Sequence, residues 1–121
     1  CDEGSVWEAA MFAGHRKLDS LVAIIDYNKL QAFGHTKEVL DLEPLAKKWE
    51  SFGWAAREVD GHDIGAMRKL FAKVPFEKGR PSVVIAHTTK GKGVSFMEGK
   101  LEWHYKSLKP EEEKQALEEL K

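Results

Sequence analysis

The sequence has one cysteine, no long apolar run and no excess of charge of either sign. With Cys1 alone, no disulfide can form within the chain, and without a CxxC or Cys/His pair it has no structural zinc signature. No apolar stretch approaches the roughly 20 residues of a membrane-spanning helix, and no charged-then-apolar signal segment opens the chain. We therefore predict a cytoplasmic protein that does not contact a membrane.

Charge and length narrow the class of partner further. The 19 lysine and arginine residues nearly cancel the 20 aspartate and glutamate residues, and the basic residues are scattered along the chain. This distribution argues against a nucleic-acid-binding surface and favours a small, polar substrate. At 121 residues with 42% hydrophobic residues, the chain has enough apolar content for one core but not for two.

The beginning of the chain is unusual. It starts at Cys1 rather than at methionine, and residues 1–4 lead straight into a predicted helix as though a strand and its turn should precede them. We expect the sequence to be truncated before Cys1. Ser5 and Glu8 fit a capping box, in which each side chain binds the other residue's backbone N–H at the start of a helix.

Apolar runs with strand character alternate with helical patterns along the rest of the chain. The predicted strands are residues 21–27, 54–59 and 82–87, and the predicted helices are residues 6–16, 43–52, 64–74 and 110–120, with Asp63 as the cap of the third helix. Residues 29–42 show no periodicity and predict a long, ordered loop. The fold class is therefore α/β, a partial doubly wound parallel sheet of three strands with flanking helices.

The first strand ends in oxygen-bearing residues. The apolar run over residues 21–25 predicts a buried strand, and it changes abruptly to Asp26 and Asn28, with Leu30 able to add a backbone carbonyl if the chain turns there. In parallel sheets ligands bind beyond the carboxyl ends of the strands, and Mg²⁺ prefers carboxylate, amide and carbonyl oxygens. An ordinary turn is the alternative, since Asp and Asn are common turn formers.

Two other segments carry polar groups at strand ends or in loops. Residues 88–93 (TTKGKG) follow the third strand, and Lys90 with exposed backbone N–H groups could hold a phosphate, although the segment lacks the spacing of a known phosphate loop. A solvated basic turn is the alternative. His104 lies in a non-periodic stretch beside two aromatic residues, which fits either a buried, hydrogen-bonded histidine or one that moves protons.

Several of these segments together resemble transketolase. They are EGSVWEAA at residues 3–10, DYNKLQ at 26–31, DGHD at 60–63, TTKGKGVSFM at 88–97 and WH at 103–104. The resemblance covers essentially all of residues 1–121. It points to the N-terminal, thiamine-diphosphate-binding section, especially the form found as a separate subunit. The chain would then be the C-terminal portion of the pyrophosphate-binding domain, with the thiamine-diphosphate-binding fold.

The resemblance implies a magnesium site at the first strand end. It makes the Asn28 side chain and the Leu30 backbone carbonyl the Mg²⁺ ligands, with the metal holding the diphosphate of thiamine diphosphate. Asp26 becomes a neighbour of the site rather than a ligand. The family's Gly-Asp-Gly segment, which supplies a further aspartate ligand, would lie before Cys1.

The resemblance also implies roles for residues farther from the metal. Lys90 matches a residue that lines the cofactor pocket, and His104 matches a histidine near the diphosphate and the substrate, which we take as the catalytic residue. Glu3 and Glu8 match acidic residues at a dimer interface that links paired active sites, and we count them with the cofactor-binding residues. The family usually has glycine after the histidine, whereas Tyr105 follows His104 here.

The implied reaction is the transfer of a two-carbon ketol unit between sugar phosphates, as in the pentose phosphate pathway. The implied partner is a pyrimidine-binding domain or a C-terminal transketolase subunit, in a homo- or hetero-oligomer. The glutamate that activates the cofactor belongs to that partner, so this polypeptide alone should be inactive. Alternatives are another thiamine diphosphate enzyme, of the 1-deoxyxylulose-5-phosphate synthase or 2-oxo acid dehydrogenase type, or a non-catalytic α/β module that pairs with a partner chain.

Overall fold

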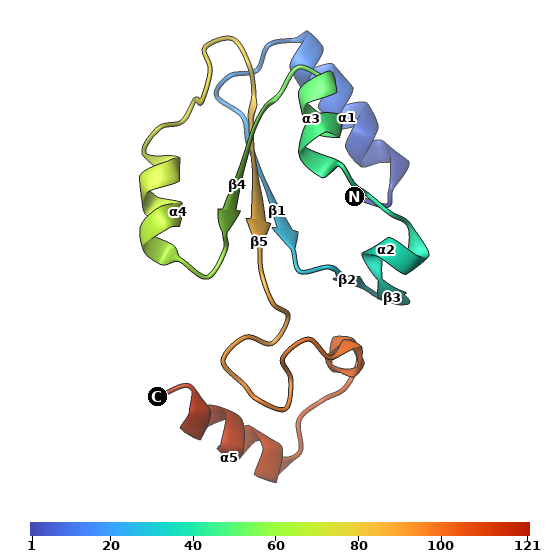
Figure 1. The fold of residues 1–121 in the computed structure, drawn as a ribbon, viewed down its shortest axis with the longest axis vertical. Helices are drawn as coiled ribbons and strands as arrows, with labels where there is room; N and C mark the ends of the chain where they lie inside the picture. The colour runs from blue at the N-terminus through green and yellow to red at the C-terminus, as the bar shows by residue number, and fades with distance from the viewer.

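A three-stranded parallel sheet lies at the centre of the computed structural model, which describes residues 1–121. The strands are β1 (Val22–Tyr27), β4 (Ala55–Asp60) and β5 (Ser82–His87), in the order β1-β5-β4 (Figure 1). Both pairings are parallel, with Ser82 aligned with Val22 on one side and with Ala55 on the other. The predicted α/β class and all three predicted strands are confirmed.

The place of β1 in the sheet differs from the prediction of a buried strand. β1 pairs only with β5 and forms an edge, and Ile24 is 58% exposed. The central strand is β5, in which Val83 and Val84 are fully buried. An unbroken apolar run indicates a buried strand but not its position in the sheet, because the order of the strands depends on contacts between distant segments.

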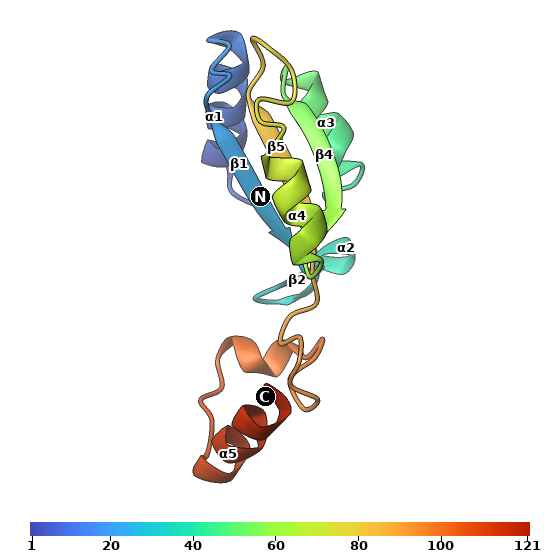
Figure 2. The same ribbon diagram turned by 90° about the vertical axis from the view of Figure 1, so that its left-hand side faces the viewer.

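Helices cover both faces of the sheet. Helices α1 (Gly4–His15) and α3 (Leu45–Ser51) lie on one face, and α4 (Ile64–Phe71) lies on the other, nearest β4 (Figures 1 and 2). The core forms between α1, α3 and the sheet. Its buried members are Ala10, Ala13, Tyr27, Leu42, Leu45, Trp49, Trp54, Ala56, Val83 and Ile85.

Aromatic residues join the two helices of that face. The Trp54 indole N–H donates to the carbonyl oxygen of Ala10 at 2.9 Å, which ties the segment before β4 to α1. The Trp49 and Trp54 rings meet edge to face with centroids 4.8 Å apart. Buried aromatic pairs of this kind add about 0.5–1.5 kcal/mol beyond the burial of their area.

Two predicted helix starts are corrected. Helix α1 begins at Gly4 with Glu3 as its N-cap, and the Ser5 hydroxyl donates to the Glu3 carboxylate at 2.9 Å, so the predicted capping box of Ser5 and Glu8 is wrong. Ser5 already lies inside the first turn, where its side chain cannot cap. Helix α3 begins at Leu45 rather than at residue 43, and the Glu43 carboxylate instead accepts a hydrogen bond from the Leu45 N–H at 2.9 Å.

The predicted loop 29–42 contains short regular elements. These are the two-residue strands β2 (Leu30–Gln31) and β3 (Gly34–His35), which form a hairpin, and the one-turn helix α2 (Thr36–Val39). Asp63 caps α4 as predicted, because its carboxylate accepts from the Ala66 N–H at 2.8 Å.

The C-terminal segment lies beyond the carboxyl ends of the strands, in orange and red in Figure 1. It contains a 3₁₀ turn, η1 (Leu101–His104), and the predicted C-terminal helix, α5 (Pro110–Glu119). The Glu119 carboxylate accepts hydrogen bonds from the backbone N–H and the hydroxyl of Ser95, which fixes α5 against the loop that follows β5. None of the helices combines the length and the apolar character needed to span a membrane.

Candidate functional site

The carboxyl ends of β1, β4 and β5 meet at one edge of the sheet, above the C-terminal segment (Figure 1). At the end of β1 the chain turns sharply at Lys29, whose φ of 66° lies in the left-handed region. The Asn28 side-chain oxygen accepts a hydrogen bond from the Leu30 N–H at 2.9 Å, which closes an Asx turn. The predicted turn therefore forms, and Asn28 shapes it.

The hairpin fixes the direction of the Leu30 carbonyl. The Thr36 N–H donates to the Lys29 carbonyl at 2.9 Å, and Leu30 lies opposite His35 in the antiparallel ladder. Because hydrogen-bonded and non-hydrogen-bonded pairs alternate along such a ladder, Leu30 and His35 form a non-hydrogen-bonded pair. The Leu30 carbonyl consequently points away from β3, toward the same side as the Asn28 side chain.

Four of the predicted site residues line one cavity of about 230 Å³ between the sheet and the C-terminal segment. They come from three separate segments: the turn after β1, the loop after β5, and η1. The full lining is Asn28, Leu30, Gln31, Lys90, Leu101 and His104. The structure thus brings together residues from distant parts of the sequence, from Asn28 to His104.

The loop after β5 carries Lys90 to the cavity. The Lys90 carbonyl accepts from the Gly99 N–H at 2.9 Å, which closes residues 90–99 into a compact loop. Gly91 has a φ of 71°, and a Cβ there would lie 2.7 Å from the Cβ of Met97. The loop therefore needs glycine at position 91 for both its backbone shape and its packing.

His104 lies at the end of η1 and contacts Tyr105. The two rings meet edge to face with centroids 4.6 Å apart. Tyr105 has a φ of −119°, a backbone conformation that any residue adopts, so the turn after His104 does not require glycine. The tyrosine at this position therefore does not distort the backbone.

Other predicted residues lie outside this cavity. Asp26 does not line it, and its carboxylate accepts a hydrogen bond from the Thr88 hydroxyl. Glu3, the N-cap of α1, and Glu8, within α1, are both exposed. The structure therefore gathers four of the six predicted site residues and leaves the two glutamates on another surface.

The oxygen atoms that line the cavity are of the kind that binds a hard cation such as Mg²⁺. The remaining ligands of that cation would come from outside this chain. Asn28 and Leu30 offer neutral oxygens, and no group of three His, Cys, Asp or Glu residues in the structure could hold a metal on its own. Mg²⁺ takes six oxygens in octahedral geometry and usually keeps several from water and phosphate. Two protein oxygens beside Lys90 suit a Mg²⁺-bound diphosphate better than an all-protein metal cage.

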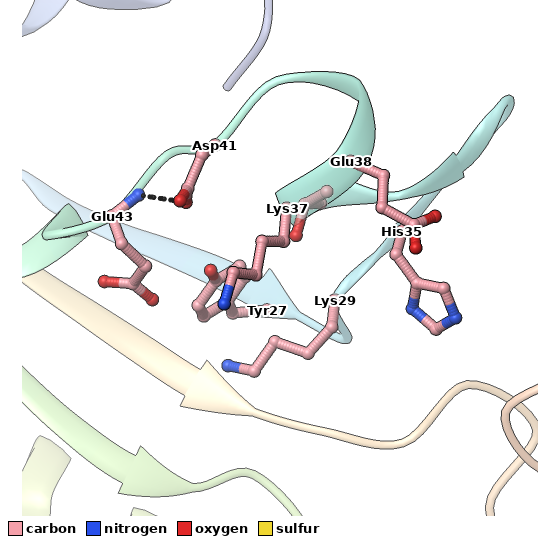
Figure 3. A pocket seen from close by; sticks show the side chains of 8 residues that line it. Tyr27, Lys29, His35, Lys37, Glu38, Asp41 and Glu43 are labelled. Carbon is pink, nitrogen blue, oxygen red and sulfur yellow. Dashed lines mark hydrogen bonds between the residues drawn. The ribbon is translucent and has the colours of Figure 1, made fainter.

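A larger cavity of about 500 Å³ lies on the other side of the turn (Figure 3). It is lined by Tyr27, Lys29, His35, Thr36, Lys37, Glu38, Asp41 and Glu43. None of these is a predicted ligand. Burial raises the pKa of Tyr27 and lowers the pKa of Lys29, and the hydrogen bond from the Leu45 N–H lowers the pKa of Glu43.

A chain of three polar side chains at this edge was missed by the sequence analysis. The Lys29 ammonium lies 2.7 Å from His87 Nδ1, and His87 Nε2 lies 2.6 Å from the Glu58 carboxylate. Each residue comes from the end of a different strand or the turn after it. The sequence shows only that a polar residue lies near the end of each strand. Which of these residues contact one another depends on the register of the sheet.

Comparisons with known proteins agree on one family. The family described as "Transketolase, thiamine diphosphate binding domain" matches residues 1–120. The chain is 48% identical over 119 residues to the 6-deoxy-6-sulfo-D-fructose transketolase subunit of Clostridium sp. (strain MSTE9). It is 51% identical over 119 residues to one of the apulose-4-phosphate transketolase subunits of Actinobacillus succinogenes.

Coverage in these comparisons is unequal. Each of the two matches covers 98% of this chain but 43% of the relative, so the chain spans less than half the length of the curated relatives that it matches. Among solved structures, transketolase from Campylobacter jejuni superposes with a TM-score of 0.89 at 30% identity, over 98% of this chain and 18% of that protein.

Proposed function

Since the chain belongs to the family of transketolase thiamine diphosphate binding domains, we propose that it supplies half of a Mg²⁺–diphosphate site in a transketolase. Residues 1–121 would be the C-terminal portion of that domain. The observation that carries the proposal is the common cavity of Asn28, Leu30, Lys90 and His104. Their convergence from three segments onto one small cavity is what a shared ligand requires.

Each of the four residues has a role that suits its chemistry. The Asn28 side chain and the Leu30 carbonyl hold Mg²⁺ through hard oxygens. Lys90 places a positive charge beside the diphosphate, and His104 binds an anion or moves a proton where the diphosphate and the substrate meet. When bound, thiamine diphosphate supplies the carbanion chemistry needed to break and form the bond beside a ketose carbonyl.

The proposed reaction moves a two-carbon ketol unit from a ketose phosphate to an aldose phosphate, as in the pentose phosphate pathway. The two relatives are named as subunits, which supports a second chain as the partner. That partner would be a pyrimidine-binding domain or a C-terminal transketolase subunit in a cytoplasmic dimer or larger assembly. Glu3 and Glu8, exposed at the start of α1, would then lie at the interface between paired sites.

Calorimetric titration of thiamine diphosphate and Mg²⁺ tests this proposal on the chain with its partner subunit. We expect saturable binding that Asn28→Ala weakens by about tenfold or more, since the variant removes a metal ligand. Lys37→Met is the matched control, because Lys37 lines the other cavity, and it should leave the affinity unchanged. Absence of binding with both the partner subunit and the family's Gly-Asp-Gly segment present would favour the alternative of a non-catalytic α/β module.

A further inference from the structure

The turn that presents the proposed magnesium ligands has an unfavourable backbone conformation at its centre. Lys29 has a φ of 66°, and residues with a Cβ rarely adopt this region unless their surroundings hold them there. Asn28 and Leu30 flank it and line the smaller cavity, whereas Lys29 lines the larger one. The side chain at the centre of the turn therefore extends to the side opposite its two neighbours.

The Lys29 side chain is held at its charged end. Its ammonium lies 2.7 Å from His87 Nδ1 and 3.3 Å from the centre of the Tyr27 ring. Figure 3 shows the side chain extending toward Tyr27 and away from His35. A short hydrogen bond from a charged donor and a cation–π contact both favour this one position of a long, flexible side chain.

His87 is fixed in turn by Glu58. A lysine ammonium can only donate hydrogen bonds, so His87 Nδ1 accepts and the ring carries its proton on Nε2. That Nε2–H donates to the Glu58 carboxylate at 2.6 Å. The chain from Lys29 through His87 to Glu58 thus connects the turn after β1 to the ends of β5 and β4.

We propose that Lys29, His87 and Glu58 form a tether that holds the turn of residues 28–30 in the shape that presents the Asn28 and Leu30 oxygens to Mg²⁺. The proposal rests on the function proposed above for this cavity. His87 and Glu58 are positioning residues, because they act through Lys29 and do not line the cavity. The tether also keeps the ammonium of Lys29 on the side of the turn away from the metal.

Amide hydrogen exchange at Leu30 tests the tether without any ligand. The Leu30 N–H donates to the Asn28 side chain only while the turn keeps its shape. We expect His87→Ala and Lys29→Met each to speed this exchange about three- to tenfold, the loss expected of one charge-assisted hydrogen bond. Glu58→Gln keeps an acceptor for His87 and should have a smaller effect than Glu58→Ala.

Lys37→Met is the control, because it removes a lysine charge from the larger cavity without touching His87. It should leave Leu30 exchange unchanged. Unchanged exchange in both His87→Ala and Lys29→Met would overturn the tether. Equal effects of Lys37→Met and Lys29→Met would overturn it as well, since they would show a response to charge alone.

Mn²⁺ binding, measured in the presence of thiamine diphosphate, tests the consequence for the metal. We expect His87→Ala and Lys29→Met each to weaken Mn²⁺ binding about three- to tenfold, and the double variant to be no weaker than Lys29→Met, because both changes break one tether. Removing a nearby positive charge alone would strengthen cation binding. Stronger Mn²⁺ binding by Lys29→Met would therefore contradict the tether.

The two experiments separate failure of the tether from failure of the proposed function. If the chain binds no Mn²⁺ with thiamine diphosphate even when the partner subunit and the family's Gly-Asp-Gly segment are present, the proposed magnesium site is wrong, and the tether is judged by Leu30 exchange alone. If the unaltered chain binds Mn²⁺ but the variants match it in both measurements, the proposed function stands and the tether is wrong.

Discussion

Gly14, near the end of α1, lies where the backbone of α1 closely approaches the backbone that follows α3. A Cβ at this position would overlap the carbonyl oxygen of Phe52, and the Cα of Gly53 lies 3.7 Å from it. No rotation of a side chain can relieve that overlap, because the obstructing atoms belong to the backbone at the end of α3. The packing of α1 on α3 thus depends on a residue without a side chain.

Gly14→Ala should lower the free energy of unfolding by about 2 kcal/mol or more, because α1 or the end of α3 must move to accept the methyl group. Gly4→Ala is a matched control in the same helix, since a Cβ at Gly4 has nothing within 4 Å. That change should be neutral or stabilising by up to about 1 kcal/mol, as expected for alanine replacing glycine in a helix. Urea unfolding of both variants measures the difference, and equal stabilities would contradict the close approach.

Glu43 makes stability depend on pH. The hydrogen bond from the Leu45 N–H is the main cause that holds the pKa of Glu43 below its usual range, and the Tyr27 hydroxyl adds to it. A carboxyl with a lowered folded-state pKa contributes stability that is complete above its unfolded-state pKa, about 4.3 for glutamate, and is lost as pH falls through the folded-state value. The stabilisation is therefore present at neutral pH and disappears in acid.

We expect the stability difference between the unaltered chain and Glu43→Gln to shrink as pH falls below about 4.3, because the protonated carboxyl and the amide then resemble each other. Unfolding in urea across a pH series measures this difference. Glu50→Gln is the control, since Glu50 is exposed in α3 and makes no side-chain hydrogen bond. A difference for Glu43→Gln that stays constant from neutral pH into acid would contradict the stabilising role of the charged carboxylate.

Sequence reasoning found the residues of the small cavity but not those that hold them in place. Asn28, Leu30, Lys90 and His104 were identified from strand ends and from family motifs, and the motifs carry information about contacts across the chain. The contact of Lys29 with His87 depends on which strands are neighbours and in what register they pair, and neither follows from local pattern. The alternative interpretation of Asn28 as a turn former is confirmed, because its side chain closes the Asx turn, whereas its role as a metal ligand stays a prediction.

At the scale of elements, the start of α4 shows a cap that sequence predicts well. Asp63 precedes an apolar helical pattern, and its carboxylate accepts from the Ala66 N–H at 2.8 Å. Asp63→Ala should lower the free energy of unfolding by about 1 kcal/mol, the usual cost of losing an N-cap, whereas Asp63→Asn should cost much less. Thermal or urea unfolding measures both, and equal losses for the two variants would show that the cap hydrogen bond is not the cause.

Short elements and the exact helix starts were harder to predict. The hairpin of β2 and β3 has two residues in each strand, too few for any periodicity to appear. At α1, both Glu3 and Ser5 are polar residues near a helix start, and the local pattern favoured serine although Glu3 takes the cap position. Boundaries of this kind are decided by one or two hydrogen bonds, which tertiary contacts can easily shift.

At the scale of the whole molecule, the outer edge of β1 is open. β1 pairs only with β5, and Ile24 is 58% exposed on this edge strand. An exposed strand edge with apolar side chains offers a template for pairing with another chain.

We expect this chain alone to self-associate as its concentration rises, and Ile24→Lys to weaken that association with little change in the free energy of unfolding, because lysine on an edge strand opposes pairing. Sedimentation velocity over a concentration series measures the association. Phe33→Lys is the control, since Phe33 is 83% exposed but lies at the tip of the small hairpin. Equal effects of the two changes would contradict an association through the β1 edge.

The most direct test of the proposed half-site is a map of paramagnetic broadening by Mn²⁺ on the backbone NMR spectrum of the chain, recorded with thiamine diphosphate. Weak binding is sufficient for this measurement. We predict that the signals of Asn28, Leu30, Lys90 and His104 broaden first, and that Asn28→Ala abolishes the effect. Broadening centred instead on His35, Lys37 and Glu38 in the larger cavity, or a map unchanged by Asn28→Ala, would contradict the account.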